Sequence, residues 1–308
     1  IDAEWRRNRA QMLLAAWRSA APHVLVLELF PFGRRQMRFE LLPLLEAARE
    51  APRPPAVVCS VRDILGGQRS PERREETVGV VERFFDHVLV HSDPTVIALD
   101  RTFPLAGRIS RKIQYTGYIV DSSPGSLSKE SFGAGEVLVS AGGGAVGARL
   151  LETAMRARPL TAFRDRTWRV LAGDNMNAEA YASLARLAQD GIVLERSRND
   201  FMTLLANCDL SVSQAGYNTL METLAARARA VVVPFAGAAE TEQTLRARCF
   251  AERGLLELVE ESALAPQTLA AAIERAHGRP RPAPGEIDLE GARKSAELIG
   301  RWARERAA

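Results

Sequence analysis

The sequence predicts an α/β protein built from two doubly wound domains. Short apolar runs alternate with longer segments of helical spacing along most of the chain, the pattern of a parallel sheet covered by helices. The chain has 308 residues, which is long for one ordinary hydrophobic core and comfortable for two. A stretch rich in Ser and Gly, residues 121–135, interrupts the alternation and is the best candidate for a linker.

The first half of the chain, residues 1–120, predicts a small parallel sheet. Two segments with apolar residues at helical spacing, 37–50 and 73–86, lie between the apolar runs and predict the helices that cover it. The predicted strands are 23–28, 55–60, 87–91 and 112–116.

The second domain is expected over residues 136–287, where the same rhythm restarts. Its predicted strands are 136–140, 168–173, 191–195, 209–213 and 230–234, and its predicted helices are 147–157, 177–189, 199–206, 218–227 and 240–253. A proline-rich piece, 278–286, then leads into a last amphipathic helix, and we expect 288–308 to pack back towards the first domain. The ligand of such a pair is expected in the cleft between them, outside the carboxyl ends of the strands.

Composition excludes several classes of function. The net charge is only +3 and basic residues are interleaved with acidic ones, so we expect no nucleic-acid partner. No apolar run approaches the roughly 18 residues of a membrane span. The three cysteines are scattered without metal-ligand spacing, which indicates reduced, buried thiols in a cytoplasmic protein.

Glycines follow the first strand of the second domain. Gly142, Gly143, Gly144 and Gly147 let the backbone turn tightly before a helix, where free N–H groups and the helix dipole suit a phosphate. Ordinary turn chemistry is an equally good interpretation of this stretch alone. A dehydrogenase fingerprint is not complete here, because no acidic residue ends the next strand.

The strand at 209–213 runs into "QAGYNTLMETL". Gly216 permits close approach of the backbone, and Asn218 or Thr219 can cap the helix or donate to a phosphate oxygen. Glu222 has two acceptor oxygens, the natural partner of the vicinal hydroxyls of a ribose. The alternative is that Asn218 is an ordinary N-cap and Glu222 an acid favoured by the helix dipole.

The strand at 230–234 ends in Pro-Phe, and acidic and amide side chains follow. Helix capping explains Glu240 and Glu242 and leaves Gln243 unexplained. Three strand ends of one domain thus carry polar residues or glycines. Such a combination is less probable by accident than a single strand end of this kind.

At these residues the second half resembles the donor-binding domain of GT-B glycosyltransferases of the MurG-like family. The family's glycine loop is matched by residues 143–149, its Gly-to-Glu motif by 215–222, and its Pro-Phe strand end with an acid-Gln pair by 234–235 and 242–247. The resemblance covers roughly residues 112–277. It departs from the family at Ala145, where a serine is usual, and at the turn of Ser197 and Arg198.

The resemblance implies a nucleotide-sugar donor, with UDP as the expected nucleotide. It places Gly143, Gly144 and the helix start at Gly147 near the diphosphate, with Gly216 and Thr219 opposite. It also implies that Glu222 holds the ribose, that Glu242 and Gln243 hold sugar hydroxyls, and that the turn from Arg198 to Phe201 holds the base.

The first half lacks the glycine-rich loop with a histidine that opens such enzymes, so we expect its first β/α units to be absent and the N-terminal, acceptor-side domain to be incomplete. An inverting transfer needs a base for the acceptor hydroxyl. The candidates at strand ends are Glu28, Asp63 and His91, and Arg62 could help the phosphates. Each is individually more often a capping or supporting residue.

The sequence therefore predicts a GT-B protein, two Rossmann-like domains facing across a cleft, that moves a hexose from a UDP-sugar to a hydroxyl acceptor. The acceptor is unknown and could be membrane-associated, which would place the protein at the inner face of the membrane. No cofactor or metal is expected. The alternatives are an epimerase or hydrolase of nucleotide sugars with the same fold, and a non-catalytic nucleotide-sugar-binding protein.

Overall fold

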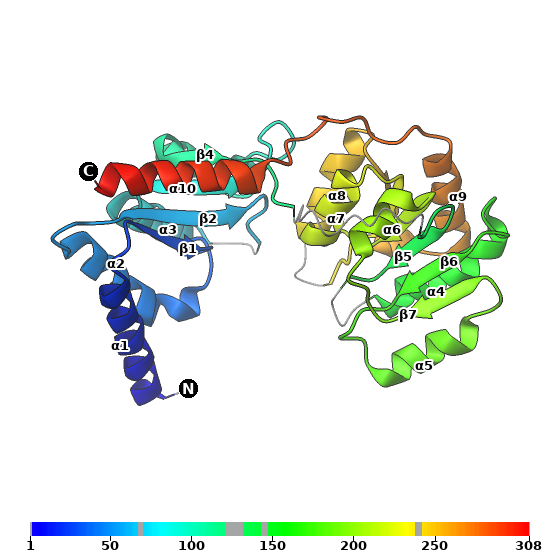
Figure 1. Cartoon of the computed structure of the whole chain (residues 1–308), viewed down its shortest axis with the longest axis horizontal. Coiled ribbons are helices and arrows are strands. Elements are labelled where there is room, and N and C mark those ends of the chain that lie inside the picture. Colours follow the sequence, from blue (N-terminus) through cyan, green and yellow to red (C-terminus); the bar gives the residue numbers. More distant parts are fainter. Residues whose placement is uncertain (1, 67–69, 121–131, 143–146, 238–241, 308) are drawn as a thin grey trace. The chain divides into compact units, whose positions relative to one another are not determined.

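The computed structural model describes residues 2–66, 70–120, 132–142, 147–237 and 242–307. The chain divides into two compact units, each with its own core (Figure 1). Unit 1 comprises residues 1–119 and 287–308, and unit 2 comprises residues 120–286. The α/β class with two parallel sheets agrees with the predicted fold class. Most of the predicted linker, residues 121–131, lies outside the described residues.

Unit 1 has a parallel sheet of four strands in the order β1-β2-β3-β4. The central strands are short runs of buried Val, Leu and Cys side chains, as both covered faces of a parallel sheet require. The strands are β1 (Val24–Glu28), β2 (Ala56–Arg62), β3 (His87–His91) and β4 (Ile113–Tyr115).

Helices cover both faces of this sheet. One face packs against α2 (Arg38–Glu50) and α3 (Pro71–Phe84), through side chains such as Leu44, Leu45 and Val81. The other face packs against α10 (Gly291–Ala307), whose Trp302 lies among Ala56, Val58 and Leu89. The Trp302 ring also stacks on His87, with ring centroids 3.8 Å apart.

A helix at the start of the chain, α1 (Ala3–Ala20), was not predicted. Its signals are present in the sequence, because Asp2 accepts a hydrogen bond from Trp5 N–H as N-cap, and Leu13, Leu14 and Trp17 share one face. It packs beside α2, where Arg9 donates to the buried carboxylate of Glu40 at 2.6 Å.

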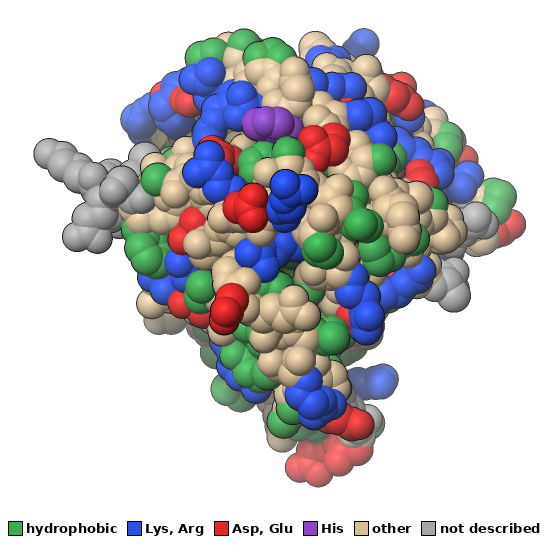
Figure 2. Space-filling model, turned by 90° about the vertical axis from the view of Figure 1, so that its right-hand side faces the viewer, with side chains coloured by type: hydrophobic (Ala, Val, Ile, Leu, Met, Phe, Trp, Pro, Cys, Tyr) green, Lys and Arg blue, Asp and Glu red, His purple; other side chains and the backbone are tan. Residues whose placement is uncertain are grey.

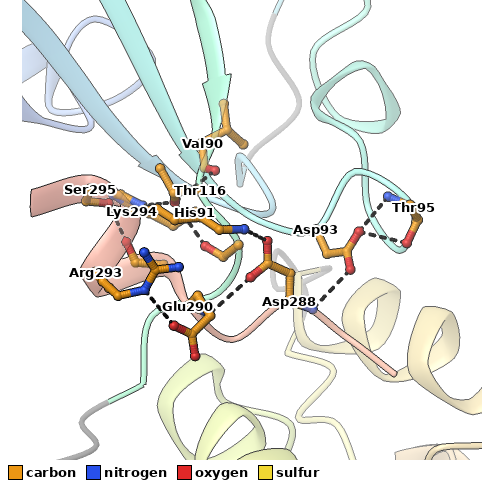
Figure 3. A network of polar contacts seen from close by, with 12 residues as sticks. Val90, His91, Asp93, Thr95, Thr116, Asp288, Glu290, Arg293, Lys294 and Ser295 are labelled. Carbon is orange, nitrogen blue, oxygen red and sulfur yellow. Dashed lines mark hydrogen bonds and ion pairs between the residues drawn. The ribbon is translucent and has the colours of Figure 1, made fainter. Parts of the chain in front are cut away.

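The C-terminal segment joins unit 1 by close backbone contact. Tyr118 N–H donates to Asp288 O at 2.7 Å, and Gly291 N–H donates to Tyr118 O at 3.0 Å. Figure 3 shows the polar contacts around this junction, including Asp288 N–H donating to Asp93 Oδ2 at 3.1 Å and the Lys294–Asp288 ion pair. The start of the last helix is therefore hydrogen-bonded to Tyr118, three residues after the end of β4.

Unit 2 has a parallel sheet of six strands in the order β10-β9-β8-β5-β6-β7. Five of them correspond to predicted runs; the two-residue β10 is too short to leave a periodic signal. The strands are β5 (Val137–Ser140), β6 (Trp168–Leu171), β7 (Ile192–Glu195), β8 (Leu210–Ser213), β9 (Ala230–Val232) and β10 (Glu257–Leu258).

The helices of unit 2 lie on both faces of its sheet. Side chains of α4 (Ala148–Ala157), α5 (Ala178–Leu187) and α9 (Pro266–His277) form one core with β5, β6 and β8. Residues of α6 (Phe201–Asn207) form a smaller core on Leu138 and Leu171. The other described helices are α7 (Tyr217–Ala225) and α8 (Glu242–Glu252). Helix α9 was not predicted, although Pro266 at its first position and Leu269 and Ile273 below it are start and core signals.

The surface bears charges of both signs. Figure 2 shows one face of the molecule, on which Lys and Arg side chains are interspersed with Asp and Glu side chains. In the part of the chain that the structure describes, no helix has both the length and the apolar character needed to cross a membrane.

Candidate functional site

The carboxyl ends of β5 and β8 form the topological switch point of unit 2. From β5 the chain proceeds through β6 to β7 on one side of the sheet, and these three strands are labelled in Figure 1. It then returns to place β8 directly against β5 and continues to β9 and β10 on the other side. The loops after two neighbouring strands then diverge to opposite faces of the sheet, which opens a crevice for ligands in doubly wound folds.

The two described glycines of the loop after β5 have backbone conformations that other residues rarely adopt. Gly142 has φ +70° and Gly147 has φ +127°, both in the region that favours glycine. A Cβ on Gly147 would lie 2.6 Å from Ala141 Cβ, so a side chain cannot be accommodated without a shift. Gly143 and Gly144, the predicted diphosphate contacts, lie outside the described residues.

The loop after β8 leads directly into α7, whose N-cap is Gly216. Gly216 has no side chain to cap the helix, and Asn218 and Thr219, for which capping was one interpretation, lie inside the first turn, where Asn218 is exposed. Helix α4 likewise has a glycine N-cap, Gly147, without a side-chain cap. Within the described residues, both helices at the switch point therefore begin at a glycine, which supplies no side-chain hydrogen bond to the first backbone N–H groups.

The two loops lie against each other. A Cβ on Gly142 would be 3.6 Å from Thr219 Oγ1, and one on Gly147 would be 3.5 Å from Gln214 Nε2. The predicted donor-side residues Gly147, Gly216, Asn218 and Thr219 are thus brought to one edge of the sheet. Two adjacent helix N-termini give this edge a positive field suited to an anion.

Glu222 is the sixth residue of α7 and is partly buried. Glu222 follows Thr219 by three residues, so the two share one face of α7. This places a carboxylate and a hydroxyl on the same side of the helix, near its N-terminus.

The loop after β9 is held by side chains of α8 and of the segment after β10. Phe235 N–H donates to Gln243 Oε1 at 3.1 Å, and Ala236 N–H donates to Glu261 Oε2 at 2.7 Å. The amide oxygen of Gln243 therefore holds the loop after β9. Glu242 is the first residue of α8; Glu240 lies outside the described residues.

A cavity of about 230 Å³ lies beside this loop. The cavity lies between the start of α4 and the ends of β8 and β9. It is therefore next to the switch point, on the side of β9. Its lining is Gly147, Arg149, Leu150, Gln214, Val233, Pro234, Phe235, Glu261 and Leu264.

Arg198, predicted near the base, is tied into its own turn. Its Nε and Nη2 donate to the two carboxylate oxygens of Asp200 at 2.7 and 2.9 Å, and Nη1 donates to Glu195 at 3.2 Å. Hydrogen bonding to Asp200 raises the pKa of Arg198 and lowers that of Asp200. The guanidinium also lies 4.5 Å from the Phe132 ring centroid. These contacts fix the turn between β7 and α6.

In unit 1 the candidate base His91 is buried in a chain of side-chain hydrogen bonds. Ser60 Oγ lies 2.7 Å from His91 Nε2, and Thr116 Oγ1 lies 2.9 Å from Nδ1. Thr116 Oγ1 also lies 3.0 Å from Gly117 O, so this hydroxyl bridges the ring and the backbone. Figure 3 shows His91 directed towards Thr116 beside the start of α10. Burial, with Arg62 nearby, lowers the pKa of His91 to about 4.

The other two candidate bases have contrasting surroundings. Glu28, at the end of β1, is 63% exposed and pairs with Arg34 at 2.5 Å. Asp63, just beyond β2, is fully buried and accepts from Ile64 N–H at 2.9 Å. Because β1 and β3 lie on either side of β2, all three candidates stand at the same edge of the unit 1 sheet. Among the described residues, no group of His, Cys, Asp and Glu side chains is placed to hold a metal ion.

Three side chains that sequence reasoning assigned to no role also contribute to these sites. Ser60 and Thr116 hold the ring of His91, and no local pattern signals them because they come from different strands. Arg246 of α8 is buried against the loop after β8. The sequence signal for Arg246 was its place in the motif that begins at Glu242, four residues earlier.

Comparison with known proteins gives these loops a family context. Residues 138–294 match the glycosyltransferase family 28 C-terminal domain. A UDP-N-acetylglucosamine--N-acetylmuramyl-(pentapeptide) pyrophosphoryl-undecaprenol N-acetylglucosamine transferase of Syntrophotalea carbinolica is 34% identical over 165 residues, 51% of this chain and 44% of the relative. The transferase of the same description from Nitrosococcus oceani is 30% identical over 209 residues, 61% of this chain and 57% of the relative. The chain spans about half the length of these curated relatives.

Solved structures show the same fold at low sequence identity. The MurG structure of Acinetobacter baumannii gives a TM-score of 0.62 at 16% identity, covering 98% of this chain and 81% of that one. A protein of Listeria monocytogenes, described as a UDP-N-acetylglucosamine 2-epimerase, gives 0.65 at 12% identity, covering 99% and 81%. The fold is therefore shared by transferases and an epimerase. The match over residues 138–294, about half of the sequence, decides the family: this chain belongs to glycosyltransferase family 28.

Proposed function

We propose that this protein binds a UDP-sugar in unit 2 and transfers its hexose, with inversion, to a hydroxyl acceptor. The observation that carries the proposal is the meeting of two helix N-termini, each begun by a glycine without a side-chain cap, at the β5/β8 switch point. Such an edge suits a diphosphate, and membership of glycosyltransferase family 28 supports a nucleotide sugar as its carrier.

The roles that we propose follow the placement of the side chains. The N–H groups at the starts of α4 and α7, with Thr219 Oγ1, hold the diphosphate, and Glu222 accepts hydrogen bonds from the ribose hydroxyls. Glu242 and the NH₂ group of Gln243 meet the sugar. Arg198 acts on the base only by fixing the turn, because its guanidinium is engaged by Asp200 and Glu195.

The donor proposal is tested by calorimetric titration of the protein with UDP, ADP and GDP. UDP is expected to bind most tightly, and Glu222→Ala to weaken its binding by about 1.5–3 kcal/mol, the cost of losing a charge-assisted hydrogen bond. Glu179→Ala is the matched control, because Glu179 is an exposed acid in the first turn of α5. An unchanged affinity in Glu222→Ala contradicts the ribose role.

For transfer, we propose that one of Glu28, Asp63 and His91 accepts the acceptor's proton. His91 is neutral at pH 7 and its Nε2 lies 2.7 Å from Ser60 Oγ, so we propose that a proton passes to the ring through Ser60. The relatives' names describe an acceptor on an undecaprenol carrier, which supports including lipid-linked compounds in the assay. Release of UDP that depends on added membrane lipid extract is the expected result.

An epimerase or hydrolase of nucleotide sugars remains the second candidate, because one structural neighbour is described as an epimerase. That likeness supports the fold alone, whereas the sequence relatives are named as transferases. Conversion of UDP-sugar without any acceptor would favour the second candidate. Donor binding without turnover under either condition would favour a binding protein.

A further inference from the structure

We propose that unit 1 holds a second binding site, for a small amphiphilic anion, in a cavity at the amino-terminal edge of its sheet. An amphiphilic anion here means a molecule with one apolar body and one acidic group, such as a carboxylate. The inference goes beyond the proposed function, because the candidate bases stand at the opposite edge of the same sheet and the proposed donor residues belong to unit 2.

The cavity has a volume of about 570 Å³ and lies where two helices lead into strands. One wall is the connection from α1 to β1, residues 21–23, and another is the connection from α2 to β2, residues 51–55. A third element contributes Arg306, in the last turn of α10. Figure 1 shows that α10 ends, at the label C, on the side of unit 1 from which β2 starts. The volume is in the range of about 300–1,000 Å³ that is typical of small-molecule sites.

Most of the lining is apolar and rigid. Trp17 contributes an aromatic wall, and four proline rings, which fix the backbone torsion, belong to Pro22, Pro52, Pro54 and Pro55. Because such a lining is preformed, a ligand that enters it orders few side chains. The indole N–H of Trp17 is buried and has no acceptor within the described residues. In folded proteins such donors nearly always find a partner, which can be a bound molecule.

Arginine dominates the polar part of the lining. The guanidinium groups belong to Arg18, Arg53 and Arg306, and the one carboxylate of the lining belongs to Glu50. Arg306 pairs with Asp86 at 3.5 Å, whereas within the described residues neither Arg18 nor Arg53 takes part in an ion pair. Guanidinium groups bind carboxylates and phosphates through paired hydrogen bonds. The cavity therefore favours a ligand with an acidic group for the exposed arginines and an apolar body for the aromatic and proline rings.

The arginines also have a simpler use, because the helix dipole favours cations near the carboxyl end of a helix. Arg18 is in the last turn of α1, and Arg306 is in the last turn of α10. This use explains their places in the sequence, but it requires neither a cavity nor an apolar lining. A dipole role alone predicts that substitution changes stability, whereas a binding role predicts that it changes the affinity for an anion.

The test is fluorescence titration of the full chain with two dyes of similar shape. Anilinonaphthalene sulfonate has an aromatic body and one anionic group, and phenylnaphthylamine is its neutral analogue. Arg18→Gln/Arg53→Gln is expected to weaken binding of the anionic dye roughly five- to ten-fold, because two partly exposed charged contacts are lost, and to leave binding of the neutral dye within about two-fold. Octanoate is expected to displace the anionic dye, and octanol is not.

Two further variants distinguish the cavity from the rest of the surface. Ala47 of α2 lines the cavity and is half-buried, so Ala47→Phe fills the cavity and should weaken the binding of both dyes. Arg164→Gln/Arg186→Gln removes the same net charge from exposed positions of unit 2. This control should leave the binding of both dyes unchanged.

Several outcomes would overturn the inference. Unchanged affinity for the anionic dye in Arg18→Gln/Arg53→Gln or in Ala47→Phe would mean that the dye binds elsewhere. Equal weakening of the two dyes in Arg18→Gln/Arg53→Gln, or equal displacement by octanol and octanoate, would mean that the cavity does not select an acidic group. An equal loss in Arg164→Gln/Arg186→Gln would show an effect of net charge alone.

Thermal unfolding of each variant shows whether the fold is kept, and Ala47→Leu repeats the comparison if Ala47→Phe unfolds. The dyes report on unit 1 and the donor proposal on unit 2, so UDP binding can fail while this inference holds, and the reverse.

Discussion

His91, the last residue of β3, is buried with a hydroxyl group beside each of its ring nitrogens. Its position at the end of β3 was predicted from the sequence, whereas its two hydroxyl partners come from Ser60 of β2 and Thr116 after β4. Each ring nitrogen lies within hydrogen-bond distance of a hydroxyl oxygen. Burial then holds the pKa of the ring at about 4.

We expect this histidine to make stability depend on pH. Because the pKa is lowered from 6.5 to about 4 on folding, the neutral form is favoured in the native state. Its contribution is fully present above pH 6.5 and is lost as the pH falls through 4, a change of about 3 kcal/mol in the free energy of unfolding.

Urea unfolding at pH 7.5, 6, 5 and 4, followed by tryptophan fluorescence, measures this change against His91→Gln. The variant keeps a polar side chain between Ser60 and Thr116 but cannot gain the proton. An equal slope of stability against pH in both proteins would show that His91 is not responsible.

At the scale of the element, the N-terminal residues of α7 and α10 are both glycines with a structural reason for their position. Helix α7 begins at Gly216 with no side-chain cap, whereas α5 begins at Asn177, whose side chain accepts from Ala180 N–H. A glycine N-cap stabilises a helix less than an asparagine N-cap, and in the proposed donor site the first N–H groups of α7 bind the diphosphate.

Gly216→Ser is therefore expected to stabilise the protein and weaken UDP binding together. Gly216 has φ −59° and open space where Cβ would lie, so serine fits and can accept from the N–H groups of the first turn. We expect a gain of about 0.5 kcal/mol in unfolding free energy and a loss of about ten-fold in UDP affinity, since the new cap competes with the ligand.

Gly79→Ala is the control for that variant, because Gly79 lies in α3 with nothing within 4 Å of its Cβ position. It should stabilise by about 0.5–1 kcal/mol without changing UDP affinity. Tighter UDP binding in Gly216→Ser would contradict the proposed use of these N–H groups.

Helix α10 begins at Gly291, where the backbone comes too close to the 117–118 segment for any side chain. A Cβ there would lie 2.5 Å from the carbonyl oxygens of Gly117 and Tyr118, which are backbone atoms and cannot move aside. Gly291→Ala should therefore destabilise unit 1 by about 1–3 kcal/mol as the junction shifts.

Gly300→Ala in the same helix is the matched control. Its Cβ would meet only the flexible end of Arg304, at 3.5 Å, so the substitution should be neutral or stabilise by helix propensity. Urea unfolding of the two variants distinguishes these expectations, and similar stabilities would show that the close approach at Gly291 is not a constraint.

At the scale of the whole molecule, each unit has its own sheet and hydrophobic core. The proposed donor residues all belong to unit 2, whereas the three candidate bases belong to unit 1. A ligand that binds one unit stabilises that unit by mass action and leaves the other unchanged.

We therefore expect scanning calorimetry to show two transitions, of which only one rises with UDP. At 100 times the dissociation constant the gain is about 2.7 kcal/mol in unit 2. Gly291→Ala should lower the other transition and so assign it to unit 1. A single transition shifted by both changes would show that the units unfold together.

The sequence by itself determined the α/β class, the alternation of strands and helices, and the loops where glycines and acids gather. These features are local: apolar runs and helical spacing report how each short segment buries its side chains. The helices α1 and α9 were missed although Asp2 and Pro266 mark their starts, because their apolar stripes are thin or rich in alanine.

Only the tertiary structure decided which of these segments meet. The return of β8 to lie against β5 joins Gly142 to Thr219, and packing of α8 buries Arg246 against Ala215. Ser60, His91 and Thr116 come from three separate parts of the chain. Such contacts depend on strand order and on burial against distant residues, which no spacing along the sequence encodes.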